Sequence, residues 1–123
     1  MPDKNVSPVG WYIGSYIIRF TELENPNDND ESRCYAWENT RIIKAKSFSQ
    51  AYDKILKVAK LDTKPYKGGP EGIPVQWVFE GVTELLPVYE EIEDGSELMY
   101  KEINRTKLKN LRKLIKSKNE LTR

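Results

Sequence analysis

Alternating hydrophobic and polar residues mark the first part of the chain as a pair of strands. The segments GWYIGSYIIRFTEL (10–23) and RCYAWENTRIIKA (33–45) are rich in aromatic and β-branched residues, which favour strands. Because the polar segment between them (24–32) contains several Asn and Asp residues, we expect a hairpin. The first strand is apolar on both faces at its start, which predicts a central position in a sheet.

A helical spacing follows in the segment SFSQAYDKILKVAKL (47–61). Ser47 is a suitable N-cap, and Gln50 three residues later completes the pattern of a capping box. The apolar residues of this segment recur on one side of the helix, which we expect to cover one face of the sheet. The members of that side are Phe48, Ala51, Tyr52, Ile55, Val58 and Ala59.

The segment VQWVFEGVTELLPV (75–88) has the clearest strand pattern of the chain. Most of its large apolar residues share one parity and its glutamates share the other, which predicts a half-buried antiparallel strand. Gly81 in the middle of the run indicates a bulge. The dipeptide Asp94-Gly95 lies between two strand-like arms and predicts a further hairpin.

The C-terminal segment TKLKNLRKLIKSKNEL (106–121) again has a helical pattern, with an apolar stripe among basic residues. The element order therefore predicts an α+β fold. One helix would pack on a face of an antiparallel sheet of about four strands in the order β-β-α-β-β, followed by a basic C-terminal helix. We divide the chain into a flexible leader (1–9), a single α+β domain (10–103) and a basic amphipathic C-terminal helix (104–123).

The composition excludes several kinds of chemistry. The chain has 123 residues, of which 32% are charged and 38% hydrophobic, a balance typical of one globular domain. It contains no histidine, which removes the Ser-His-Asp triad and His-ligated metals. We expect Cys34, the only cysteine, to be a buried structural thiol. No catalytic residue, metal ligand or cofactor is predicted, and without a signal peptide or spanning segment we expect a cytoplasmic protein.

The net charge of +1 conceals an uneven distribution. Residues 101–123 contain nine Lys and Arg and two Asp and Glu, so this end carries +7, whereas the 100 residues before it carry −6. An acidic body joined to a basic end is typical of a partner-binding protein, although the two parts can also neutralise each other.

The aromatic residues could stack nucleic-acid bases or form a core. Because the strand aromatics alternate with polar residues and the helix offers an apolar side, we predict a core that contains Trp77, Phe79 and Phe48. Trp37 stays open to either role. We interpret the acidic cluster around Asp94 as a solvated turn, because its spacing does not fit a calcium-binding loop.

Three interpretations of the basic C-terminal helix stay open. Its apolar stripe can dock on the body, which would leave the basic side chains in water. It can instead mediate self-association, because Leu108, Leu111 and Ile115 have the spacing of paired helices. In the third interpretation the basic side chains bind nucleic-acid phosphates, and the candidates are Lys109, Arg112, Lys113 and Lys116.

Several motifs together resemble one known family. They are Trp11-Tyr12 in the first strand, Ala45 with Ser47 at the start of the helix, Trp77 to Val82, and Asp94 to Glu97. With these motifs, residues from about 10 to 100 resemble the bacterial domain-of-unknown-function family 4288. The resemblance implies an α+β fold and assigns no activity or catalytic residue.

We expect a non-enzymatic protein-binding module, an inhibitor of the immunity type that docks on a toxin or another effector protein. The grounds are the missing catalytic constellation, the uneven charge and two long loops. The immunity role is an analogy of size and fold. The alternatives are a nucleic-acid-binding protein and, second, an enzyme that uses carboxylates and a divalent metal. The predicted contact residues are Asp28, Asp30, Glu31, Trp37 and Tyr66.

Overall fold

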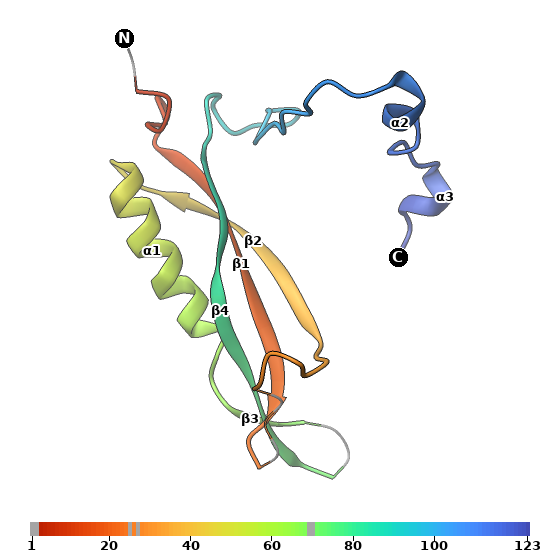
Figure 1. Cartoon of the computed structure of the whole chain (residues 1–123). Helices are drawn as coiled ribbons and strands as arrows, with labels where there is room; N and C mark the ends of the chain where they lie inside the picture. Colours follow the sequence, from red (N-terminus) through yellow and green to blue (C-terminus); the bar gives the residue numbers. More distant parts are fainter. Residues whose placement is uncertain (1–2, 25, 27, 69–70) are drawn as a thin grey trace.

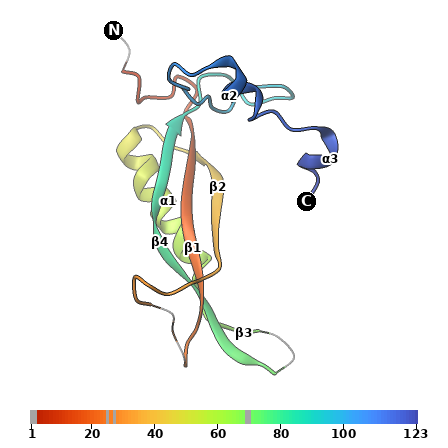
Figure 2. The ribbon, with the colours of Figure 1, turned by 45° about the vertical axis from the view of Figure 1, so that its right-hand side comes forward.

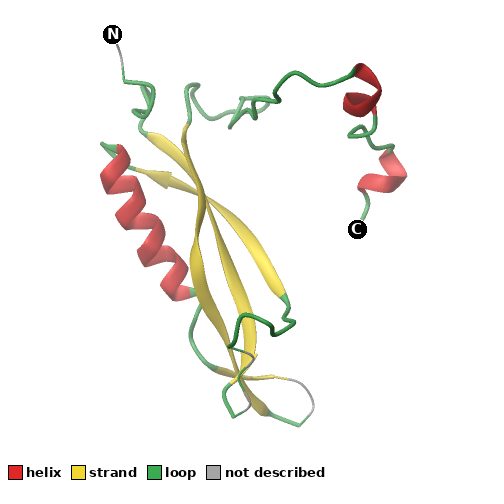
Figure 3. Cartoon of the chain, viewed as in Figure 1, coloured by secondary structure: helices red, strands yellow, loops and turns green. Residues whose placement is uncertain are grey.

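The body of the protein is a four-stranded antiparallel sheet with one long helix on one face (Figure 1; Figure 3). The predicted α+β fold and the order β-β-α-β-β are confirmed. The computed structural model describes residues 3–24, 26, 28–68 and 71–123. The strands are β1 (Trp11–Glu22), β2 (Ala36–Lys44), β3 (Tyr66–Gly68) and β4 (Ile73–Pro87), and the helices are α1 (Phe48–Leu61), α2 (Leu108–Arg112) and α3 (Lys118–Leu121).

Strand β1 lies inside the sheet, which has the order β2-β1-β4-β3. Both of its neighbours run antiparallel to it, so that Tyr12 lies opposite Ile43 of β2 on one side and opposite Pro87 of β4 on the other. The hairpin predicted for the first two strands is therefore confirmed. All five residues from Tyr12 to Tyr16 are buried, which agrees with the apolar character of both faces at the start of this strand.

Strand β4 carries two irregularities close to Gly81, where the sequence predicted a bulge. The pairing with β1 shifts by one residue between Ser15 and Tyr16 and again between Ile17 and Ile18. Each shift adds one residue to β4 and exchanges the faces on which the following side chains lie. Val82 therefore shares a face with Phe79, although strict alternation would place the two side chains on opposite faces.

Helix α1 begins as the sequence predicted. The side chain of Ser47 accepts a hydrogen bond from the backbone N–H of Gln50 at 3.1 Å, and the Gln50 side chain accepts one from the backbone N–H of Lys46 at 2.6 Å. The Ser47 bond satisfies a donor that the first turn of a helix leaves without an intrahelical partner, and the Gln50 bond holds Lys46, the residue before the N-cap, at the start of the helix.

A narrow stripe of α1 contacts the sheet. Ala51, Ile55 and Ala59 are completely buried, and they pack against tyrosines of β1 in the core. Phe48 is 37% exposed, so the prediction that its ring lies in the core is wrong, and Tyr52 on the same predicted apolar side is 43% exposed. The alanines let the helix lie close to the strands, and side chains on the flanks of so narrow a stripe point into the solvent.

After α1, strand β4 corresponds to the strand predicted at 75–88, but its hairpin partner is not the predicted one. Short β3 pairs with the start of β4, whereas the arms around Asp94-Gly95 form no strand. The turn itself is present, since Gly95 has a φ of +86°. The hydroxyl of Ser96 donates to the carbonyl of Glu91 at 2.5 Å and accepts from the N–H of Glu93 at 2.8 Å. A side chain thus binds backbone groups that a strand ladder would otherwise use.

The two ends of the chain contact the body differently. Within residues 3–9, expected as part of a flexible leader, residues 3–6 and Pro8 are exposed, whereas Ser7 is buried and its hydroxyl donates to the carbonyl of Val88 at 2.5 Å. The C-terminal segment forms two short helices instead of one. Ser117 and Glu120 make a capping box that starts α3 as a separate helix, a signal that the sequence contained. Cys34 is exposed and not buried, because it lies in the loop before β2.

Both C-terminal helices stand away from the body in Figure 1, and in Figure 2 α3 lies clear to the side of the sheet. Within the described part of the chain, neither α2 nor α3 contacts a strand or α1. The apolar side chains of this segment are accordingly exposed or half-exposed.

The close approach of α1 to β1 makes Gly14 intolerant of a side chain. An added Cβ would lie 2.8 Å from two carbons of the buried Ile55 side chain. Gly14→Ala should therefore lower the free energy of unfolding by about 1–3 kcal/mol, measured by chemical denaturation. Gly81→Ala is the matched control, because a Cβ there would meet no atom within 4 Å. Combining Gly14→Ala with Ile55→Ala should cost less than the sum of the two single changes, and simple additivity would contradict the steric explanation.

Candidate functional site

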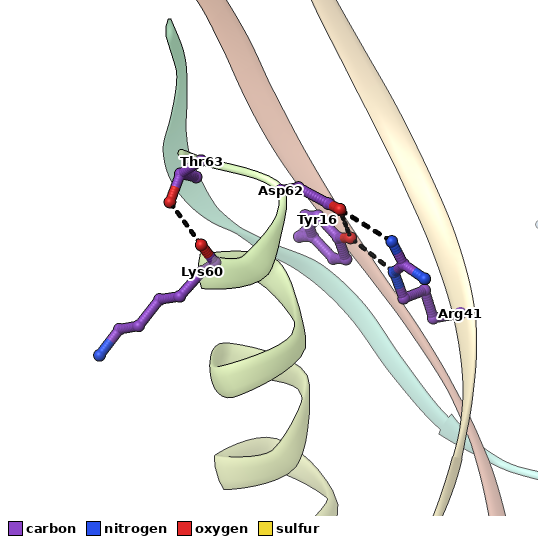
Figure 4. A network of polar contacts seen from close by, with 5 residues as sticks. All are labelled: Tyr16, Arg41, Lys60, Asp62 and Thr63. Carbon is purple, nitrogen blue, oxygen red and sulfur yellow. Dashed lines mark hydrogen bonds and ion pairs between the residues drawn. The ribbon is translucent and has the colours of Figure 1, made fainter. Parts of the chain in front are cut away.

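Three side chains from three elements meet where α1 ends (Figure 4). Asp62, the C-cap residue of α1, binds the guanidinium group of Arg41 in β2 at 2.9 and 3.0 Å. The hydroxyl of Tyr16 in β1 donates to Asp62 and accepts from Nε of Arg41 at 2.8 Å. Tyr16 is completely buried, so these bonds satisfy a hydroxyl group that water does not reach. We call these three residues the helix-end cluster, because they attach the end of α1 to two strands.

The helix-end cluster holds Asp62 in its charged form. Partial burial by itself raises the pKa of a carboxyl group. The hydrogen bonds from Tyr16 and Arg41 outweigh that effect and lower the pKa of Asp62 from its ordinary value of 3.8. The hydrogen bond with Tyr16, followed by the one with Asp62, raises the pKa of Arg41. Both groups are therefore fully charged near neutral pH, and their ion pair holds the end of α1 against β1 and β2.

Beyond the helix-end cluster the sheet continues without the helix and presents a row of rings. The rings of Trp37 and Trp77 lie 5.0 Å apart between centroids, and those of Phe20 and Trp77 lie 5.6 Å apart in an edge-to-face arrangement. Phe79 lies 6.2 Å from Tyr16 and connects the row to the core. We call this surface the aromatic face; its members are Phe20, Trp37, Trp77 and Phe79.

The register of the strands explains why these rings gather. Trp37 of β2 and Phe79 of β4 both lie opposite Ile18 of β1, and Trp77 lies opposite Phe20. Residues opposite each other in a sheet point to the same face, which here is the face that carries α1. The two indoles therefore meet across β1.

The aromatic face both covers a small core and remains accessible. Ile18 beneath it is only 3% exposed, so the rings shield it from water. Trp37 is nevertheless 60% exposed, and Tyr35 beside it in the sequence is 81% exposed. The other three rings are half-buried. The prediction of a core role thus holds in part for Trp77 and Phe79, and Trp37 takes the surface role that the sequence left open.

The predicted contact residues do not form one surface. Trp37 lies on the aromatic face, whereas Asp28 and Asp30 line a hollow on the opposite face of the sheet, together with Arg19 and Glu80. Glu31 is exposed in the same loop as the two aspartates. Tyr66 belongs to β3, but its side chain lies outside the described part of the chain.

The basic candidates lie together at the C-terminal end. Lys109, Arg112, Lys113 and Lys116 are all exposed. Lys109 and Lys113 share a shallow concave surface on and after α2 with Arg105. The apolar residues with paired-helix spacing, Leu108, Leu111 and Ile115, lie on the same segment and have no partner among the described strands.

The aromatic face is mainly apolar contact area. Aromatic rings and one buried aliphatic side chain supply this surface, Arg33 and Cys34 line a pocket beside Phe20, and Arg41 and Asp62 of the helix-end cluster are bound to each other. Among the described residues, no group of three Cys, Asp or Glu side chains could hold a metal ion. No helix in the same part of the chain is long and apolar enough to cross a membrane.

The fold defines a small α+β domain whose single long helix covers part of one sheet face. Residues 11–100 match the family model of a domain of unknown function, DUF4288, and the chain therefore belongs to that family. This match confirms the family that the motifs resemble, and it leaves α2 and α3 outside. No curated protein and no solved structure matches the chain.

Sequence reasoning missed two parts of the site. The helix-end cluster has no motif, because Tyr16, Arg41 and Asp62 are far apart in the chain and meet only through the sheet register. Phe20 and Tyr35 were also not chosen as candidates. For Phe20 a signal existed, since it shares the parity of Tyr16 but lies beyond the part of β1 that a helix of this length can cover.

Asp62→Asn should lower the free energy of unfolding at neutral pH by about 1–3 kcal/mol, since Tyr16 and Arg41 lose a charged partner. The folded-state pKa of Asp62 is lower than the unfolded-state value. Its stabilisation is therefore fully present above the unfolded-state value and is lost as the pH falls through the folded-state value. Denaturation curves from neutral to strongly acidic pH should converge for the two proteins. Asp53→Asn, an exposed position of α1, is the control, and curves that stay parallel in acid would refute this role of Asp62.

Proposed function

We propose that this protein is a non-enzymatic binding module that docks another protein on its aromatic face. The observation that carries the proposal is the exposure of Trp37, 60%, beside Trp77 on a hydrogen-bonded sheet. Trp and Tyr are the side chains most enriched among residues that dominate binding energy at protein interfaces. Rings held on regular strands also lose little conformational entropy when a partner covers them.

The charge of the body supports a basic protein as the partner. The first 100 residues carry −6, so a basic protein is attracted, whereas a nucleic acid is repelled from this part of the chain. The exposed loop with Asp28, Asp30 and Glu31 joins β1 to β2 near the end of the sheet that carries the aromatic face. A Lys or Arg of the partner would also gain cation–π attraction on an exposed indole such as Trp37.

Inhibition of a toxin or another effector is a narrower version of this proposal. It rests on the similarity in size and fold class to immunity proteins, and fold alone does not establish function. A binding surface that carries no catalytic group suits an inhibitor, because an inhibitor acts by occupying its target.

Trp37→Ala tests the aromatic face. The protein and the variant serve as baits in a cell extract from the native host, captured proteins are quantified by mass spectrometry, and the affinity for the purified partner is then measured by calorimetry. We expect the variant to bind at least about 30-fold more weakly, as for an aromatic hot spot worth about 2 kcal/mol. Because Trp37 is largely exposed, the variant should keep its fold, which circular dichroism checks.

Ile42→Ala is the matched control, because Ile42 is exposed on the same strand and its side chain lies on the opposite face. It should bind the partner as the unchanged protein does. Equal affinity of the Trp37 variant and the control for the captured partner would contradict docking on the aromatic face. Failure to capture any protein with the unchanged bait would count against a protein-binding function altogether.

Nucleic-acid binding at the C-terminal end is a second candidate, favoured by the concave basic surface of Arg105, Lys109 and Lys113. If it holds, a gel-shift assay with single-stranded and double-stranded probes should detect complexes that weaken steeply as salt is added. The full-length Lys109→Glu/Lys113→Glu variant should lose the shift, and Trp37→Ala should keep it. A probe that shifts both variants equally would exclude the basic surface as the site.

A further inference from the structure

A groove with acidic and apolar sides lies at one end of the sheet, and the aromatic face lies at the other end. It has a volume of about 250 Å³ and lies between the end of β4 and the segment that follows the Asp94-Gly95 turn. We call it the acidic groove. Leu86, Leu98 and Tyr100 line its apolar side, and Glu90, Glu97 and Glu102 supply its charge.

The turn next to the groove has an ordered geometry of its own. Besides the hydrogen bonds of Ser96, the carboxylate of Glu90 accepts the backbone N–H of Glu97 at 3.1 Å, which joins the two arms. Leu98 and Tyr100 are 44% and 66% exposed, so their apolar surface faces the solvent without a cover. The groove therefore combines a shaped apolar surface with three carboxylates.

The C-terminal segment of the same chain has the complementary properties. In the sequence Leu108, Leu111 and Ile115 recur at the spacing of one helix side; in the structure the two leucines lie on α2, Ile115 follows its end, and all three are exposed or half-exposed. Basic residues such as Lys109 and Lys113 alternate with them. The segment 101–123 carries +7, and within the described part of the chain neither of its helices contacts the body.

We infer that the C-terminal segment of one molecule binds in the acidic groove of a second copy, and that the exchange is reciprocal. The leucines would cover Leu98 and Tyr100, and the flanking Lys side chains would meet the glutamates of the groove, as when an amphipathic helix lies in a groove. The reciprocal exchange is a closed two-fold arrangement, which gives a dimer and not an open filament.

The path of the chain favours a second copy over the molecule's own groove. Glu102 lines the groove, and α2 begins at Leu108, so only residues 103–107 connect them. In Figure 1 this connection runs away from the sheet, and among the described residues α2 contacts no strand. An exchange between molecules uses that direction unchanged, whereas binding to its own groove requires the connection to reverse immediately outside the groove.

Two charge-reversal variants of the full-length protein test the exchange. The groove variant is Glu97→Lys/Glu102→Lys, which leaves the Glu90 hydrogen bond in place, and the tail variant is Lys109→Glu/Lys113→Glu. Sedimentation velocity should show a dimer for the unchanged protein that weakens as salt is added. Each variant alone should raise the dissociation constant about tenfold or more, because like charges then face each other.

Mixing the two variants distinguishes exchange from binding within one molecule. In a mixed dimer both contacts pair opposite charges, so the mixture should recover the affinity that each variant alone has lost. Binding of the tail to its own groove cannot recover on mixing, and a monomer with slow amide exchange at residues 108–115 would establish that arrangement instead. A monomer at every concentration without such protection would also overturn the exchange.

Trp37→Ala separates this inference from the proposed function. Trp37 lies on the aromatic face and not in the acidic groove, so this variant should form dimers as the unchanged protein does. Loss of the dimer in the Trp37 variant, or a dimer that resists both charge reversals, would show that another surface mediates association and would refute the exchange.

Discussion

The helix of this protein is shorter than the strands that it covers, and the exposed surface follows from that difference. The 14 residues of α1 span about 21 Å, whereas the 12 residues of β1 span about 40 Å. The helix-end cluster determines where the cover ends, because Asp62 can bind Tyr16 and Arg41 only at the middle of β1. Beyond that point the sheet has no second layer from the helix, and its apolar residues have only each other as cover. The aromatic face is therefore a direct result of packing a short helix on a long sheet.

The rings of that face show why large side chains suit such a position. Trp37 and Phe79 lie opposite Ile18, and Trp77 packs against Trp37, so these rings extend the buried cluster under α1 to which Ile18 belongs. The rings are wide enough to meet across β1, and their tilted contacts are favourable arrangements for aromatic pairs. Shielding Ile18 and offering an exposed surface are thus properties of the same side chains, because a ring that covers a neighbour with one side presents its other side to the solvent.

The sequence predicts most of the fold because local signals agree with the tertiary structure there. The capping residues Ser47 and Gln50 start α1 as expected, and the apolar parity of β4 is right at both ends. The parity is right at both ends because each of two shifts adds one residue to β4, and together they restore the alternation. Between the two shifts the alternation is reversed, so Val82 lies on the core side although it shares the parity of the glutamates. The helix-end cluster could not be predicted, because it depends on the register between distant strands. The hairpin expected at Asp94-Gly95 was wrong in its arms, since the Ser96 side chain binds the backbone groups that strands would have paired.

The two proposed binding surfaces lie at opposite ends of one sheet, and this separation limits the competition between two basic groups for the same acidic body. A basic partner on the aromatic face and the basic C-terminal segment in the acidic groove would both be attracted by the same acidic body. Dissolved ions screen the interaction between exposed charges beyond about 8 Å at physiological salt, so groups at one end of strands as long as β4 act almost independently of groups at the other end. The tail would therefore neutralise the groove and leave the loop with Asp28 and Asp30 to attract the partner. A dimer formed in this way would leave both aromatic faces accessible, because the acidic groove lies at the other end of the sheet. A partner with two or more copies of its docking site could then contact both faces of the dimer. After the first contact, the second would form at an effective concentration set by the separation of the two faces, which would raise the overall affinity.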